Sequence, residues 1–144
     1  MTSHSNDKTL FALTHRVQFS ETDMAGVVHF ANLFRWMEEV EHAFFRSLGL
    51  SIAMRHDGME IGWPRISASC EYHAPARFED EIELRLRITK LGQKSLNYEV
   101  DFLKGPDLIA RGKIATVCCA ITPNGMTPIP IPSPIRFKLA AASS

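Results

Sequence analysis

The residues best suited to chemistry lie in one short segment, from Asp23 to His29, just before and at the start of a predicted helix. Asp23 falls in the loop before that helix, and Gly26 lets the backbone turn where a side chain would obstruct it. The free donors of the helix N-terminus are then expected to be the amides of Gly26, Val27, Val28 and His29. A helix N-terminus favours negative charge. A carboxylate beside it suits acyl transfer, because the amides hold the carbonyl oxygen while Asp23 attacks the carbon or activates a water molecule.

Asp23 also has a purely structural interpretation, because Asp is favoured in turns and at helix N-caps for backbone reasons. A second set of chemical side chains, Glu38, Glu41 and His42, has the spacing of metal ligands on one helix. An amphipathic helix produces such trios by chance, because its polar face carries residues three and four positions apart. We therefore predict no metal site.

Two hydrophobic periods indicate the elements that position this segment. From about His29 to Leu48, apolar residues recur every three or four positions, which predicts a helix that Gly49 ends. Elsewhere polar and apolar residues alternate, as in antiparallel strands with one buried face. The alternating stretches are residues 11–19, 66–72, 81–88 and 96–102, and a longer apolar strand is expected at residues 109–121.

The predicted order is a strand, a long helix and then four strands, which we interpret as a meander. One helix cannot bury a wide apolar face alone, so the fold class is expected to be α+β. An antiparallel sheet of about five strands would wrap around one long central helix. Residues 1–144 are interpreted as a single domain with a polar, flexible N-terminus at residues 1–8. Residues 122–144 form a Pro-rich C-terminal segment, and its part from Thr122 to Pro134 is predicted to be extended or at a sheet edge because proline cannot donate to a ladder.

Composition excludes several other classes of protein. Lys plus Arg and Asp plus Glu both number 16, so the basic excess of a general nucleic-acid binder is missing. No apolar run has the roughly 20 residues that span a bilayer, and the first residues lack the apolar core of a signal peptide. The three cysteines are an odd number, and two of them, Cys118 and Cys119, are adjacent, which does not suit a disulfide framework. We therefore expect a cytoplasmic location without a membrane or nucleic-acid partner.

The segment from Phe19 to Asn32 resembles the motif of hotdog-fold thioesterases of the 4-hydroxybenzoyl-CoA type and of their relatives associated with the Tol-Pal system. The matching positions are Phe19, Asp23, Gly26, Val27, Val28, Asn32, Arg35 and Trp36. Further similarity lies in Ser69–Glu81, which contains Tyr72 and Pro75-Ala76, and in Lys94-Ser95. Together the similar segments extend from about Thr14 to Phe137.

The resemblance implies a hotdog fold and hydrolysis of an acyl- or aroyl-CoA thioester by Asp23, without a cofactor. It also implies a homodimer or homotetramer whose site is completed by the neighbouring subunit. Two positions depart from the family pattern. The Tol-Pal relatives have His where this chain has Phe30, and His29, one place earlier, is expected either to contact the thioester or to cap the helix. The frequent family Tyr is Leu33 here, which points to a different acyl pocket.

Substrate contacts are expected from the start of the helix and from basic side chains on the strands. Phe30, Asn32 and Leu33 are the candidates beside the acyl group. CoA carries phosphates, and the candidates to meet them are Arg65, Lys90, Lys94 and Ser95, with Arg77 and Arg111 as further basic residues. The resemblance favours Lys94 and Ser95.

Two other functions remain open at this point. Hotdog hydratases also use an acid with a His, but their motif places the His five residues after the Asp, whereas Asp23 and His29 are six apart. A non-catalytic acyl-CoA or acyl-carrier binding module would keep the pocket and basic mouth without depending on Asp23. The sequence identifies neither the acyl group nor whether Asp23 acts as nucleophile or general base.

Overall fold

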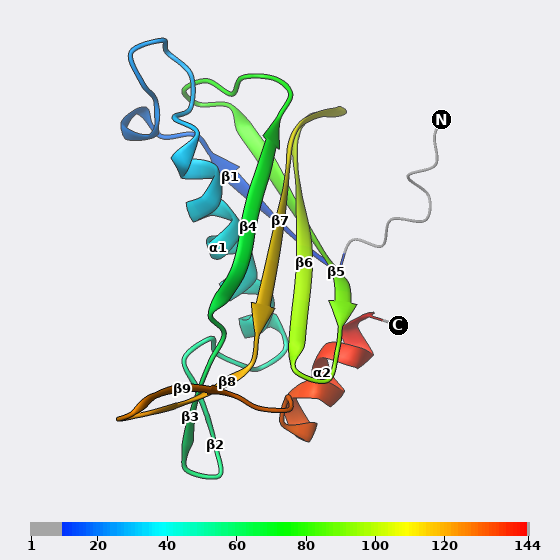
Figure 1. Cartoon of the computed structure of the whole chain (residues 1–144). Helices are drawn as coiled ribbons and strands as arrows, with labels where there is room; N and C mark the ends of the chain where they lie inside the picture. The colour runs from blue at the N-terminus through cyan, green and yellow to red at the C-terminus, as the bar shows by residue number, and fades with distance from the viewer. Residues whose placement is uncertain (1–9, 144) are drawn as a thin grey trace.

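The computed structural model describes residues 10–143, and the flexible N-terminus expected at residues 1–8 lies outside them. A long antiparallel sheet runs the length of the molecule, with helix α1 (Ala31–Ser47) against one face, as Figure 1 shows. A smaller sheet and helix α2 (Ser133–Ser143) lie at one end of the long sheet. The α+β arrangement of a five-stranded sheet around a central helix is confirmed.

The long sheet has the order β1-β5-β6-β7-β4. Its strands are β1 (Phe11–Arg16), β4 (Arg65–Tyr72), β5 (Glu81–Leu91), β6 (Ser95–Lys104) and β7 (Asp107–Val117). The expected meander is correct for β5, β6 and β7 but wrong for β4, which pairs with β7 at the far edge. The place beside β5 is taken by β1, which pairs with it from Phe11 to Arg16. One long connection therefore separates β4 from β5 across the whole sheet.

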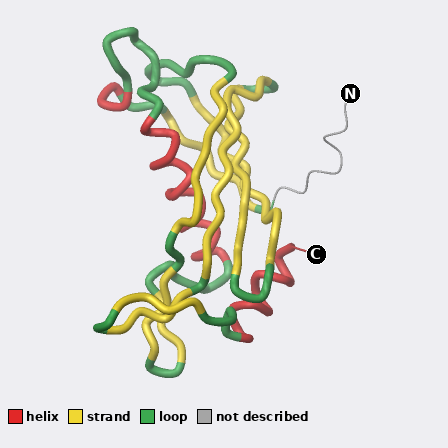
Figure 2. Tube along the Cα trace, in the orientation of Figure 1, coloured by secondary structure: helices red, strands yellow, loops and turns green. Residues whose placement is uncertain are grey.

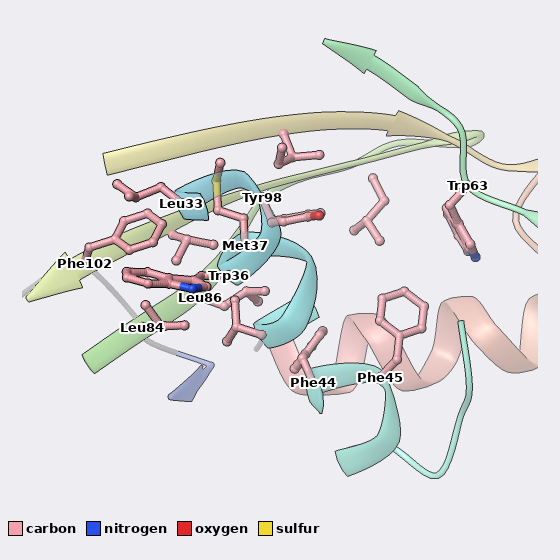
Figure 3. Close-up of a cluster of buried hydrophobic side chains, with 14 of the residues drawn as sticks. Leu33, Trp36, Met37, Phe44, Phe45, Trp63, Leu84, Leu86, Tyr98 and Phe102 are labelled. Carbon is pink, nitrogen blue, oxygen red and sulfur yellow. The ribbon is translucent and has the colours of Figure 1, made fainter. Parts of the chain in front are cut away.

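The apolar stripe of α1 packs on the inner face of the sheet. Trp36, Met37 and Val40 are almost fully buried. Figure 3 shows Trp36 beside Leu84 and Leu86 of β5, while Phe44 and Phe45 extend the cluster toward the end of the helix. The helix begins at Ala31, two residues later than the sequence pattern suggests. This burial, and not helix propensity alone, stabilises α1.

A second sheet forms where two strands of the long sheet are interrupted. Its order is β2-β3-β8-β9, with strands β2 (Met54–His56), β3 (Met59–Gly62), β8 (Cys119–Thr122) and β9 (Gly125–Pro128). The single strand expected at residues 109–121 is therefore wrong, because it breaks at Cys118 between β7 and β8. Pro64 marks the matching break between β3 and β4, since proline has no N–H for the ladder.

The Pro-rich C-terminal segment is only partly extended. Strand β9 lies at the edge of the small sheet, as expected, but Ser133 and Pro134 begin α2, a helix that the sequence pattern did not indicate. Pro134 is the second residue of α2, and proline is compatible with the first turn of a helix. Ile135 and Leu139 of α2 are buried in the core. Neither helix between residues 10 and 143 is long and apolar enough to cross a membrane.

Candidate active site

A closed loop at one end of the sheet holds Asp23. A single bridge between Thr22 and Val28 closes this loop, and the N–H of Asp23 donates to the carbonyl of Val27 at 2.9 Å. Gly26 has φ +78°, a backbone conformation that favours glycine. One carboxylate oxygen of Asp23 accepts the Ala25 N–H at 2.9 Å. Within residues 10–143 its other oxygen makes no hydrogen bond, so it is available to a ligand.

Asp23 lies on the wall of a cavity of about 430 Å³. The loop and α1 supply one side of this cavity, and the end of β4, the residues after it and β7 supply the other. Its lining comprises Asp23, Val27, Val28, Phe30, Leu33, Tyr72, His73, Ala74, Pro75 and Ile109. The walls are mostly apolar around a single carboxylate, the composition expected of a small-molecule site.

The amides beside Asp23 differ from the expected set of free helix donors. The N–H groups of Gly26, Val28 and His29 donate to the carbonyls of Asp23, Ala76 and Glu21, at 2.8–2.9 Å. That expectation is wrong for these three residues, because the segment forms a closed loop before the helix instead of its first turn. In the described part of the chain, the N–H groups of Val27 and Phe30 make no hydrogen bond. Phe30 is the N-cap of α1 and already has a helical backbone, so its amide is the free donor at the helix start.

The aromatic rings at the helix start form one edge of the cavity. The rings of His29 and Phe30 stack with centroids 4.7 Å apart, and Phe30 meets Tyr72 edge to face at 6.4 Å. Nδ1 of His29 accepts the Ala31 N–H at 3.3 Å, and His29 is not among the lining residues. Its observed contacts therefore match the capping interpretation. Phe30 and Leu33 line the cavity, as expected of substrate-binding residues.

Asn32 lies outside the cavity and connects the loop to the helix. Its amide nitrogen donates to the carbonyl of Glu21 at 2.8 Å, and its oxygen accepts a hydrogen bond from Arg35 at 2.7 Å. A substrate contact from Asn32 would have to replace one of these bonds. Within a single chain, Asn32 is a structural residue of the site.

Four of the residues expected to meet the CoA phosphates gather at the opposite end of the long sheet. Lys90, Lys94 and Ser95 flank the hairpin between β5 and β6, and Arg65 begins β4 beside them. Figures 1 and 2 show this hairpin next to α2, far from the loop that precedes α1. β4 alone spans eight residues, roughly 25 Å. These residues therefore cannot reach the Asp23 cavity of their own chain.

Arg65 is also engaged elsewhere. Its guanidinium donates to both carboxylate oxygens of buried Glu41, at 2.5 and 3.1 Å. Burial alone would lower the pKa of Arg65, but the hydrogen bonds that it donates to Glu41 outweigh this effect and raise the pKa. Arg65 is thus a permanently charged partner of a buried acid, which weakens its case as a phosphate ligand.

Residues at the end of β4 and directly after it contribute to the site, although their residue types did not identify them as site residues. Tyr72, His73 and Pro75 line the cavity, and they fall in the passage whose order resembles the family. Nothing in the local pattern placed them beside Asp23. The nearby thiol of Cys70 is a poor nucleophile, because burial raises its pKa to about 11. Among the described residues, no group of three His, Cys, Asp or Glu side chains could hold a metal ion.

A carboxylate and a free helix amide on an apolar cavity of this fold define a class of acyl-transfer enzymes. The family model described as "Thioesterase superfamily" matches residues 25–110. This match covers more than half of the chain, which therefore belongs to the thioesterase superfamily and is a thioester hydrolase.

Known relatives agree with this assignment. A 1,4-dihydroxy-2-naphthoyl-CoA hydrolase of Synechocystis is 27% identical over 124 residues, covering 85% of this chain and 90% of that protein. The structure of a gentisyl-coenzyme A thioesterase has 31% identity and a TM-score of 0.75, covering 89% of this chain and 98% of that one. A 1,4-dihydroxy-2-naphthoyl-CoA thioesterase structure from Synechocystis has a TM-score of 0.79 at 24% identity, covering 90% and 95%, and supports the fold alone.

Proposed function

We propose that this chain hydrolyses an aromatic acyl-CoA to the free acid and CoA, with Asp23 as its catalytic carboxylate. The observation that carries the proposal is the free oxygen of Asp23 on the wall of a cavity that also includes Phe30. The two groups come from a closed loop and from the N-cap residue of α1.

The substrate carbonyl would enter with its oxygen toward the Phe30 N–H. This donor lies at the positive end of α1, where developing negative charge is stabilised. Asp23 then either attacks the carbonyl carbon, forming a mixed anhydride that water hydrolyses, or removes a proton from the attacking water. In both cases the bond to sulfur breaks, the CoA thiol leaves, and water is the only other reactant. No cofactor is needed for these steps.

An aromatic acyl group is favoured by the cavity edge. Phe30 is 60% exposed, and Tyr72 lies beside it. Aromatic pairs prefer offset or edge-to-face contacts, which a flat acyl ring would make with both side chains. The names of two relatives, a naphthoyl-CoA hydrolase and a gentisyl-CoA thioesterase, point to the same substrate class. Leu33, at the position of a frequent family Tyr, keeps that wall of the cavity apolar.

A second copy of the chain would complete the site through the edge strand β4. One side of β4 pairs with β7, its other edge has no partner in the described chain, and all its residues except Cys70 are exposed. An exposed edge of this kind is a ready template for pairing with another chain. A twofold axis would pair two copies of β4 in opposite directions. The Arg65 end of one copy would then lie beside the Tyr72 end of the other.

This pairing resolves the separation between Asp23 and the basic residues. Ser95 on β6 lies level with Arg65, because β6 and β4 both pair with the end of β7. The partner's Lys94 and the partner's Ser95 would therefore lie three strand spacings from Tyr72, about 15 Å. The long arm of CoA spans such a distance between thioester and phosphates. The homodimer is thus the minimal active unit, and a homotetramer is the larger assembly implied by the resemblance. The three free cysteines suit a reducing cytoplasm.

The test is release of free thiol from a panel of aryl- and alkyl-CoA thioesters by the wild type and by Asp23→Asn. The substitution keeps the size of the side chain but removes its charge. We expect aryl-CoA to be the best substrate and the variant to lose about 10³-fold in kcat. If the variant keeps most of its activity, a catalytic role for Asp23 is excluded. A wild type that binds acyl-CoA without hydrolysing it would favour a binding module, and one that hydrates enoyl-CoA would favour a hydratase.

A further inference from the structure

The carboxylate of Glu21, two residues before Asp23, is buried and fully engaged. Glu21 is only 4% exposed. Its two oxygens lie 2.9 and 3.1 Å from Nε2 of His15, on β1. Nε1 of Trp36, on α1, donates to it at 2.9 Å, and the backbone N–H of Gln18 donates at 2.8 Å. One side chain therefore connects β1, the loop and α1.

The main chain of the same residue holds the other side of the loop. The carbonyl oxygen of Glu21 accepts the N–H of His29 and the side-chain amide of Asn32, both at 2.8 Å. These two donors lie on either side of Phe30, the residue with the free amide. Glu21 thus holds in place both the segment that leads to Asp23 and the start of α1 at Phe30.

A carboxylate at this place is an unexpected choice for stability alone. Removing a charge from water is unfavourable, and a well-packed apolar residue is often as good or better in a buried position. Burial would raise the pKa of Glu21, but the hydrogen bonds from Gln18, His15 and Trp36 outweigh it and hold the pKa below its usual value. The carboxylate is therefore ionised and accepts several directed hydrogen bonds, which specify a geometry that an apolar residue would not.

We infer that Glu21 is a positioning residue that sets the distance between the Asp23 carboxylate and the free amide of Phe30. This inference rests on the proposed roles of Asp23 and Phe30. Glu21 does not line the cavity, so it is not expected to contact the substrate. It acts through the two segments that carry the reacting groups, and displacement of such groups by about 1 Å is enough to lower a rate 10²-fold.

The groups around the carboxylate define the variants that test it. His15 also faces Glu39 of α1, with Nδ1 3.5 Å from its carboxylate, and Arg35 of α1 lies 3.9 Å from Glu21. Glu39 is therefore a matched control, because it is an acid that faces the same imidazole but is exposed to solvent. Trp36→Phe removes one donor to Glu21 and keeps an aromatic ring in the core.

The experiment compares kcat and KM for Glu21→Gln, Trp36→Phe and Glu39→Gln, with amide hydrogen exchange of the loop in each folded variant. In Glu21→Gln, one carboxylate oxygen is replaced by an NH2 group, which cannot accept the hydrogen bonds that the surrounding groups donate. We expect kcat to fall about 10²-fold with little change in KM, and exchange of the Asp23 and His29 amides to accelerate. Trp36→Phe should show a smaller effect of the same kind, and Glu39→Gln should match the wild type.

The outcomes separate this inference from the proposed function. If Glu21→Gln only lowers the Tm and keeps its kcat at a temperature where it is folded, while Asp23→Asn is inactive, the positioning role is wrong and the proposed function stands. If Asp23→Asn remains active, the proposed function fails. If, in that case, amide exchange in the loop is still faster in Glu21→Gln, Glu21 stabilises the loop but has no positioning role in catalysis.

Discussion

At the scale of single residues, one glycine shows how closely the helix approaches the sheet. Gly112 lies in β7, between Cys70 of β4 and Val100 of β6. A Cβ atom at this position would lie 2.0 Å from Sδ and 2.9 Å from Cε of Met37, which is fully buried. A glycine inside a strand often marks such a close approach. Here it lets α1 lie against the centre of the sheet.

We therefore expect Gly112→Ala to destabilise the protein by about 1–3 kcal/mol, the usual cost of overpacking a core. Met37→Ala alone removes a buried side chain and should cost about 2–5 kcal/mol. The double variant should lose less than the sum of the two, because the new methyl group fills part of the space that Met37 leaves. Urea unfolding of all four proteins measures this coupling. Strictly additive losses would mean that the two residues do not compete for the same space.

At the scale of elements, the outer face of the sheet carries a ladder of charges across three strands. Asp101 of β6 accepts hydrogen bonds from Arg87 of β5 at 3.0 Å and from Arg111 of β7 at 2.7 Å. Arg87 also contacts Glu99. Burial would raise the pKa of Asp101, but these two guanidinium groups outweigh it and lower the pKa. The ladder ties together the three strands that form the middle of the sheet.

Because the pKa of Asp101 is lower in the folded state, its carboxylate stabilises the fold at pH values above its ordinary pKa. This stabilisation is lost as the pH falls through the folded-state pKa. Asp101→Asn should therefore cost about 1–3 kcal/mol near neutral pH. The difference from the wild type should shrink in acid, as the native carboxylate becomes protonated. Urea unfolding over a range of pH tests this. Glu83→Gln is the control, since its exposed pair with Arg85 should contribute little at any pH. An equal loss at every pH would assign the effect of Asp101→Asn to packing.

At the scale of the whole molecule, the proposed dimer makes a prediction about which chain supplies Lys94. The end of the sheet that carries Lys90 and Lys94 is distant from Asp23 within one chain. A twofold axis beside β4 would bring this end to the Asp23 cavity of the neighbouring subunit. Lys94→Ala is expected to raise KM for acyl-CoA more than it lowers kcat, because it removes a contact to the CoA phosphates. The partner's Lys94 would then complete each site.

Mixing Asp23→Asn and Lys94→Ala chains tests this arrangement. In a mixed dimer, one site would combine intact Asp23 with the partner's Lys94, and the other would lack both. Random exchange of equal amounts should restore about a quarter of the wild-type kcat/KM, since half of the dimers are mixed and one of their two sites is intact. Coexpression with two affinity tags isolates the mixed dimer for assay. Activity equal to the mean of the two parents would place Lys94 in its own chain's site or outside any site.

The sequence by itself determined the local features of this protein. The stripe of α1 and the alternation of β4, β5 and β6 identified most elements, because burial of one face imposes a period of 3.6 or 2 on the residues. The resemblance carried by the order of Phe19, Asp23 and Gly26 implied the hotdog fold and the thioesterase class, which the family match and the fold confirm. The catalytic role of Asp23 remains a prediction for the Asp23→Asn measurement.

Only the tertiary structure decided which distant segments meet. A strand's pattern shows which face is buried but not which edge it pairs with, so the place of β4 beside β7 was not predictable from its residues. The cavity depends on that placement, since Tyr72 and Ile109 complete its wall. The amides of Gly26, Val28 and His29 were assigned to the wrong role for the same reason: their acceptors, including the carbonyl of Ala76, come from backbone that only the folded chain brings near. No pattern in the sequence distinguishes Glu21, because His15 and Trp36, which surround its carboxylate, come from a strand and a helix that only the fold brings together.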